Sequence, residues 1–292
     1  MKQPIELRKR RDFGQIVNDS FTFLKENFKP LFKSLFIICG FLIILGIVSS
    51  VFYYFNLGSS LSTYTNRYDA QTKTFTYLIS AFLTAFAALL SQAFIQLTTY
   101  CYISVYLEKN NTSPALEEVW GYFRYYFFRV LGSSLLIIIL LSIGFVLCII
   151  PGIYLAPAFS LIIPLIVIEN SSFSYAFNKS FALIKNNWWL VFGVIFVMSL
   201  IVGVASSFIE FPLGLVTLGD RFLPLKGLKL PVIIISSVIK NILSFAYVLP
   251  AIAICLCYFN LTEEKDGTGL LDRIEKIGKK DDNVQDLPAE EF

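Results

Sequence analysis

The distribution of charged residues constrains the fold of this sequence more than any other feature. Five stretches contain no Asp, Glu, Lys or Arg, namely Ser34–Asn66, Thr74–Leu107, Val130–Ile168, Asn186–Ile209 and Asn241–Thr262. A helix crosses about 30 Å of hydrocarbon with about 20 apolar residues, and each stretch reaches that length. Charged residues make up 15% of the chain, against about 25% in soluble domains. The pattern predicts an integral membrane protein rather than a soluble protein with five fully buried helices.

The stretch Val130–Ile168 is too long for one span. Its 39 residues would extend over about twice the hydrocarbon thickness as a single helix, at about 1.5 Å per residue. Pro151 and Gly152 lie near its middle, and proline breaks a helix while glycine permits a turn. The stretch therefore predicts a hairpin of two spans that turns at Pro151-Gly152. Pro157 and Pro164 predict kinks in the second span.

Amphipathic segments precede the predicted spans. Residues 12–29, 115–128 and 169–187 place apolar side chains on one helical face, which is typical of helices in a membrane interface. We predict an all-α polytopic membrane protein with six transmembrane helices, arranged as three hairpins that each follow an amphipathic interfacial helix. The expected spans are about 30–54, 76–106, 130–150, 153–168, 188–208 and 231–259. Residues 1–11 are a basic N-terminal segment, 12–262 the membrane domain and 263–292 a mobile charged tail.

Two of these amphipathic segments resemble each other in sequence. Asn18–Phe32 aligns with Asn178–Phe192 at a constant offset of 160 residues, and six of the fifteen aligned positions are identical. The middle segment shares the pattern without the identities. The alignment predicts an internal repeat whose unit is one interfacial helix followed by two spans. Such repeats occur in transporters and equally in purely structural bundles.

Lysine and arginine are unevenly divided between the two ends of the predicted spans. The segments 1–33, 108–129, 169–187 and the C-terminal tail carry 18 of the 24 basic residues, and the opposite loops carry five. The positive-inside rule then places both termini in the cytoplasm. Trp188 and Trp189 are expected to anchor the fifth span at the inner interface. Membrane phospholipids are expected partners, and nucleic acid is not, because the net charge is only +3.

Polar residues inside the predicted spans are the candidate functional residues. Lys240 lies within the sixth span, and an ionisable residue inside a membrane suggests a functional site. Gln92 and Gln96 lie at i and i+4 in the second span and could line a polar path with Lys240. The alternatives are that Lys240 snorkels to the outer interface and that the two glutamines form interhelical hydrogen bonds. Glu210 ends the fifth span and could pair with Arg221 or Lys240.

The sequence offers little for catalysis. It contains no histidine, which removes the commonest general base and excludes a complete Ser-His-Asp triad. Gly-rich phosphate loops, a G-x-S-x-G motif, paired catalytic carboxylates and metal-ligand clusters are not evident. The five cysteines all fall within apolar stretches, as expected of small buried hydrophobic residues. We therefore predict a protein that is not an enzyme and binds no cofactor or metal.

One region resembles a known family. Residues 148–155 contain Pro151-Gly152 and are followed by Pro164, Glu169 and the segment Ala176–Phe192. This combination resembles a bacterial group of six-helix membrane proteins that includes the glycerophosphoryl diester phosphodiesterase membrane domain. The match is clearest over residues 140–200. The resemblance implies a bacterial inner-membrane location and a membrane module without catalytic residues, because phosphodiesterase members carry a separate soluble domain for catalysis.

Two main functions follow from these features. The first is a non-enzymatic scaffold, or an assembly or envelope-homeostasis factor, that acts through lipids and through another membrane protein or a second copy of the chain. The alternative is a small transporter or permease subunit, which requires Lys240, Gln92 and Gln96 to converge on one cavity. A lipid enzyme, which would need polar residues clustered at headgroup level, is a third candidate.

Overall fold

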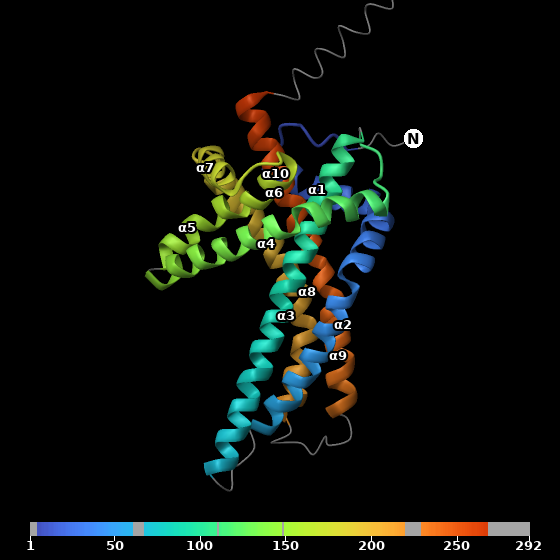
Figure 1. Ribbon diagram of the computed structural model, residues 1–292, viewed down its shortest axis with the longest axis vertical. Helices are drawn as coiled ribbons and strands as arrows, with labels where there is room; N and C mark the ends of the chain where they lie inside the picture. Colours follow the sequence, from blue (N-terminus) through green and yellow to red (C-terminus); the bar gives the residue numbers. More distant parts are fainter. Residues whose placement is uncertain (1–4, 61–66, 110, 148, 220–228, 268–292) are drawn as a thin grey trace, which may run out of the picture.

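The computed structural model describes residues 5–60, 67–109, 111–147, 149–219 and 229–267, and all regular structure within them is helical (Figure 1). Six stretches are long and apolar enough to cross a membrane, as the sequence predicted. The helices are α1 (Phe13–Glu26), α2 (Phe28–Ser60), α3 (Arg67–Glu108), α4 (Leu116–Leu147), α5 (Ile149–Ser160), α6 (Ile162–Ile168), α7 (Phe173–Ile184), α8 (Trp188–Gly219), α9 (Lys229–Leu243), the 3-10 helix η1 (Ser244–Tyr247) and α10 (Val248–Asp266).

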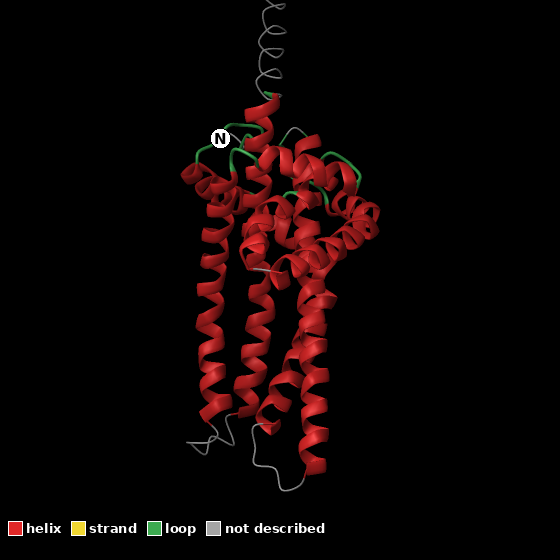
Figure 2. Cartoon of the chain, turned by 90° about the vertical axis from the view of Figure 1, so that its left-hand side faces the viewer, coloured by secondary structure: helices red, strands yellow, loops and turns green. Residues whose placement is uncertain are grey.

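Four long helical rods form the body of the molecule. Helices α2, α3, α8 and the α9–α10 pair run along its long axis, whereas α1, α6 and α7 gather at one end (Figures 1 and 2). That end also holds the C-terminal end of α10, and we call it the terminal end. The opposite end, where α2 finishes and α3 begins, is the far end. Both ends of the described chain therefore lie at the same end of the bundle, in agreement with an even number of crossings.

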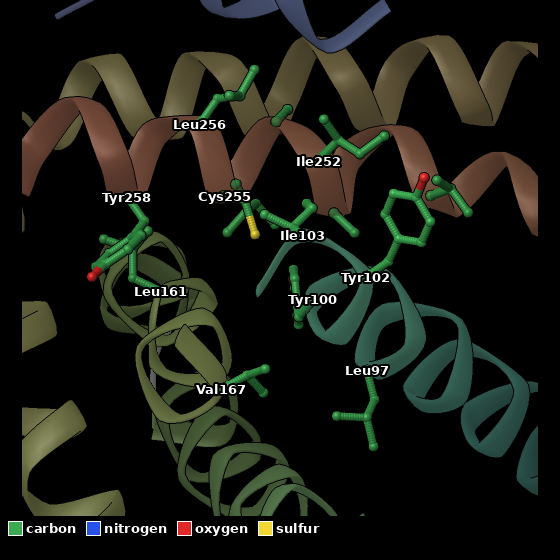
Figure 3. Packing of buried hydrophobic residues seen from close by; sticks show 14 of the residues in the cluster. Leu97, Tyr100, Tyr102, Ile103, Leu161, Val167, Ile252, Cys255, Leu256 and Tyr258 are labelled. Atoms are coloured by element: carbon green, nitrogen blue, oxygen red, sulfur yellow. The ribbon is translucent and has the colours of Figure 1, made fainter. Parts of the chain in front are cut away.

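Helix α10 is the centre of the hydrophobic core. Every residue from Val248 to Leu261 except Pro250 is buried, because α1, α3, α6, α7 and α8 all pack against this helix. A helix that is apolar on all sides is stable only when it is covered all round. Figure 3 shows Ile252 and Cys255 of α10 near Ile103 of α3, and Tyr258 of α10 beside Leu161 at the start of α6.

Proline positions explain two breaks in the helices. The predicted sixth span is divided into α9, η1 and α10, and the fourth into α5 and α6. Pro250 and Pro164 each lack an N–H and clash with the carbonyl four residues earlier, and both breaks lie within that turn. The break before Pro164 agrees with the predicted kink, and the apolar stretch Leu230–Asp266 covers the predicted sixth span although it contains a break. Pro157 lies inside α5 without ending it.

The three predicted amphipathic segments correspond to the observed helices in different ways. The first is helix α1, where Asp12 accepts a hydrogen bond from the backbone N–H of Gln15 and the Gln15 side chain accepts one from the Asp12 N–H. This reciprocal cap fixes the start of the helix. The third segment contains α7, which Ser172 caps. The prediction of a separate helix over 115–128 is wrong, because α4 continues from Leu116 to Leu147 without a proline or a cap to stop it.

Helices α4 and α5 form the predicted hairpin, but its reversal precedes Pro151 and Gly152. Helix α4 ends at Leu147 and α5 begins at Ile149, with residue 148 outside the described part. Pro151 lies in the first turn of α5, where a missing N–H costs no helical hydrogen bond. A Cβ added at Gly152 would lie 2.6 Å from Cδ1 of Phe145. Gly152 is thus needed for close helix packing rather than for the turn.

Replacing Gly152 by leucine is expected to destabilise the hairpin by about 1–3 kcal/mol, the usual cost of overpacking. The added side chain must displace the Phe145 ring of α4. Gly132 of α4 is a matched control, because nothing lies within 4 Å of a Cβ added there. Thermal unfolding in detergent measures both variants. Equal stability of Gly152→Leu and Gly132→Leu would show that the α4–α5 contact does not depend on the missing side chain.

Candidate functional site

A cavity of about 680 Å³ lies between α2, α3, α8 and α9. It extends from Gly46 at the middle of α2 and Gln92 of α3 toward Tyr53 and Glu210, which lie nearer the far end. Alanine and leucine side chains form much of its wall. Its polar lining consists of Ser50, Tyr53, Thr84, Ser91, Gln92, Ser206, Glu210, Lys240, Asn241, Ser244 and Tyr247. The cavity is thus a partly polar space within helices apolar enough to span a membrane.

An ion pair forms part of the cavity wall. Lys240 Nζ of α9 lies 2.6 Å from Glu210 Oε1 of α8 and donates a hydrogen bond of 3.3 Å to the Tyr54 hydroxyl of α2. The side chains of Lys240 and Glu210 are 40% and 52% exposed, so both charges remain accessible. Of the two partners expected for Glu210, the structure selects Lys240; Arg221 lies outside the described residues.

The two glutamines of α3 are in different surroundings. Gln92 is half-buried and lines the cavity, whereas Gln96 is half-buried and does not line it. Lys240 and Gln92 therefore line one cavity, and Gln96 is not among the residues that line it. Gln96 follows Gln92 by one helical turn toward the terminal end, beyond the reach of the cavity. Within the described residues, no hydrogen bond engages the Gln92 amide, which leaves it free for a solute or water.

Asn241 joins α9 to α2 beside the cavity, and the sequence analysis missed it. Its Nδ2 donates to Ser50 Oγ of α2 at 3.3 Å and to the Ser237 carbonyl at 2.8 Å. Asn241 packs on Gly46, where an added Cβ would overlap the Asn241 Oδ1 atom. The signal in the sequence was a small residue in one span and a carboxamide in another, a combination common at interfaces between membrane helices.

Hydroxyl groups give the cavity wall further polar connections. Thr84 Oγ1 of α3 lies 2.9 Å from the Ser49 carbonyl of α2 and 2.8 Å from the Ser80 carbonyl of its own helix. Ser91 donates to the Ala87 carbonyl of its own helix, and Ser244 of η1 donates to the Asn241 carbonyl of α9. These bonds satisfy the hydroxyl protons internally and leave oxygen lone pairs as acceptors. The ion pair and the Gln92 amide are therefore the groups best able to change partners.

The chemistry of this lining suits binding more than bond making or breaking. It provides one ammonium, one carboxylate, two carboxamides and several hydroxyls between apolar walls. A solute that carries charges of both signs could replace the contacts that Lys240 and Glu210 make with each other. Among the described residues, no group of three or more Cys, Asp or Glu side chains could hold a metal ion.

A second polar cluster lies at the terminal end. Glu169 Oε1 accepts hydrogen bonds from Lys179 Nζ of α7 at 2.7 Å and from the Tyr258 hydroxyl of α10 at 2.6 Å. Burial lowers the pKa of Lys179, but the hydrogen bond and the negative charge of Glu169 outweigh burial, so the pKa lies above its ordinary value. This cluster joins the end of α6 to α7 and α10, and no cavity opens onto it among those described.

The two tryptophans expected at the interface have different surroundings. Trp188 is half-buried, donates a hydrogen bond from Nε1 to the Tyr154 carbonyl of α5 at 2.9 Å and stacks on the Tyr154 ring. Trp189 is 78% exposed. Trp188 thus fixes α8 to α5, and Trp189 has the exposure that an interfacial anchor requires.

Replacing Gln92 by cysteine is expected to give a thiol that a small, charged methanethiosulfonate reagent modifies, because Gln92 lines the cavity. Ile95→Cys is the control, since Ile95 lies three residues along the same helix and is fully buried. The described native cysteines are buried as well. Modification rates in proteoliposomes test the expectation. Equal rates at positions 92 and 95 would contradict an open path to the cavity.

No protein-family model matches this chain, and no curated protein or solved structure matches it. The resemblance to the six-helix membrane group stays a prediction. The function is therefore proposed from the geometry of the cavity and the arrangement of the helices.

Proposed function

We propose that this protein is a small transporter or permease subunit, with the cavity between α2, α3, α8 and α9 as its solute-binding site. The observation that carries the proposal is the presence of the Lys240–Glu210 ion pair and the Gln92 amide on the wall of one cavity. The protein would bind and pass its solute without chemical change and without a cofactor or metal.

The position of the ion pair supports a binding role. Ionisable groups inside a membrane are costly, and those present commonly mark a substrate or ion pathway. A purely structural contact between α8 and α9 could be made more cheaply by apolar side chains. Lys240 and Glu210 neutralise each other as a pair, and each can attract the opposite charge of a solute.

The proposed setting is the bacterial inner membrane, with both termini in the cytoplasm. The terminal end would then face the cytoplasm, and it carries most of the lysines and arginines, as the positive-inside rule requires. The chain order supports the proposed repeat, since α1 precedes α2 and α3, and α7 precedes α8 and α9. Phospholipids would surround the apolar outer surfaces of these helices.

Native mass spectrometry from nanodiscs tests the binding role. A small molecule that co-purifies with the wild-type protein should be lost from the double variant Lys240→Gln, Glu210→Gln. It should remain in Lys185→Gln, which removes an exposed charge at the end of α7. If no small molecule co-purifies, or if the double variant retains it fully, the cavity is not a solute site.

A scaffold function is the second candidate. The observation that favours it is the dense polar network at the terminal end, where Arg11 and Glu169 each join several segments. Such a rigid end could hold another membrane protein or a second copy of the chain. The same nanodisc preparation distinguishes the functions, because a stable protein partner would persist in the cavity double variant.

A further inference from the structure

The α4–α5 hairpin has a different direction from the rest of the apolar helices. It leaves the long bundle at a steep angle (Figure 1), and its tip falls well short of the far end in both views (Figures 1 and 2). Helix α4 has 32 residues and would measure about 48 Å. It is therefore long enough to cross a bilayer, and its inclination is what keeps its tip from the far end.

The attachment of the hairpin is at the terminal end. Arg129 Nη1 of α4 donates to Asn170 Oδ1 at 2.8 Å, in the short connection between α6 and α7. Trp188, the first residue of α8, donates to the Tyr154 carbonyl of α5. Helix α5 packs against α4, α6, α7 and α8, and has no comparable packing against α2 or α9. Helix α4 also packs against α3 and α2, and Phe94 of α3 contacts aromatic rings in the first half of α4. The contacts that fix the hairpin thus lie in the part of the bundle nearer the terminal end.

The surface of the hairpin is apolar around most of its circumference. Ile138, Ile139 and Leu140 are 44%, 54% and 37% exposed. Because successive residues of a helix point about 100° apart, these three side chains lie on different faces of α4. At the tip, Val146 and Ile150 are 86% and 75% exposed. The sequence has no charged residue from Val130 to Ile168. A surface of this size and composition is not stable in water.

Lipid acyl chains are the occupant that fits this surface. A protein partner or a second copy of the chain would cover one face and leave the other exposed, whereas the exposed apolar residues surround the hairpin. The two helices satisfy their own backbone hydrogen bonds, as segments in hydrocarbon must. Gly144 and Gly152 let them pack closely, since a Cβ at Gly144 would lie 3.4 Å from Cα of Gly152.

We infer that the α4–α5 hairpin is embedded in the membrane leaflet on the side of the termini and does not cross the bilayer. The membrane crossings are then made by α2, α3, α8 and the α9–α10 rod. The hairpin enters from the terminal end, turns within hydrocarbon and returns through α6 to the same side. The number of crossings stays even, so both termini remain on one side.

Single introduced cysteines test this placement by accessibility. The test position is Ile150→Cys, combined with Cys148→Ser, in proteoliposomes of known orientation. Gln71→Cys, exposed near the start of α3, reports the far side, and Lys185→Cys reports the terminal side. A membrane-impermeant maleimide added to either side should leave position 150 unlabelled, while a lipid-soluble maleimide labels it. Labelling by the impermeant reagent from either side would overturn the inference.

Fluorescence quenching gives the depth and separates a buried tip from one that reaches the far headgroups. A bimane at position 150 is expected to be quenched by lipids brominated on the acyl chain. Nitroxide-headgroup lipids confined to the far-side leaflet should quench bimane at position 71 strongly and leave position 150 near its unquenched intensity. Equal quenching at both positions would show that the hairpin crosses the bilayer, and would overturn the inference.

Discussion

Replacing Arg11 by methionine is expected to lower the free energy of unfolding by about 3 kcal/mol, the lower end of the range for breaking a buried ion pair. The Arg11 side chain is 1% exposed, and its Nε lies 2.9 Å from Asp19 Oδ2 of α1. Its guanidinium also donates to the carbonyls of Glu6, Leu7 and Lys9. Methionine retains much of the side-chain volume and leaves the carboxylate and these carbonyls without their donor.

Arg10→Met is the matched control for the Arg11 variant. Arg10 lies next to Arg11, but its side chain is 68% exposed. Its ion pair with Glu264 is long, with 3.7 Å between Arg10 Nη2 and Glu264 Oε1. Exposed ion pairs of this kind contribute about 0–1 kcal/mol. Thermal unfolding of the two variants in the same detergent gives the comparison. Similar melting temperatures for Arg10→Met and Arg11→Met would mean that the buried network does not stabilise the terminal end.

Arg11 also shows the limit of interpreting basic residues from sequence. The positive-inside rule counts Arg11 as one of the eight basic residues in segment 1–33. That count is the same whether the side chain is buried or exposed. Its burial depends on Asn260, 249 positions away, whose Oδ1 accepts the Arg11 backbone N–H at 2.7 Å. Periodicity within a window cannot find a partner so distant, because it reports only on neighbours along one helix.

Helix content and burial were easier to predict than helix direction. The charge-free stretch Asn241–Thr262 predicts a buried or membrane helix, and it contains the enclosed part of α10. The hairpin Val130–Ile168 was also predicted, because its length excludes a single span. Its steep angle to the bundle was not, since it depends on contacts of Arg129 and Trp188 with other segments.

The candidate site was predicted in part for the same reason. Lys240 stands out in the sequence as a charge within an apolar span, and Glu210 was considered as its partner. Gln92 and Gln96 are equivalent by spacing, and the sequence gives no way to tell that the cavity reaches only Gln92. Tyr54 joins the ion pair from α2; an aromatic residue near a helix end carries no signal that separates this role from interfacial placement.

A double-mutant cycle on Lys240 and Glu210 is expected to give a coupling free energy of about 1–3 kcal/mol. Either single variant, Lys240→Gln or Glu210→Gln, leaves one charge without its partner among apolar helices, and the double variant removes both charges. The double variant should therefore be less destabilised than the sum of the singles. The side chains of Lys240 and Glu210 are 40% and 52% exposed. The expected coupling free energy is therefore below the full cost of leaving a buried charge unpaired.

The pair Lys109–Glu118 provides a matched comparison that isolates the effect of the surroundings. Its Nζ–Oε1 distance is 2.7 Å and its side chains are 38% and 37% exposed, close to the values for Lys240–Glu210. It lies at the terminal end, where water and salt screen the charges, so its coupling free energy should be smaller than that of Lys240–Glu210. In nanodiscs, raising the salt concentration should weaken the Lys109–Glu118 coupling and leave that of Lys240–Glu210 nearly unchanged. Equal couplings with equal salt dependence would place Lys240–Glu210 in bulk solvent, and a charge pair in bulk solvent could not line a binding cavity within the membrane.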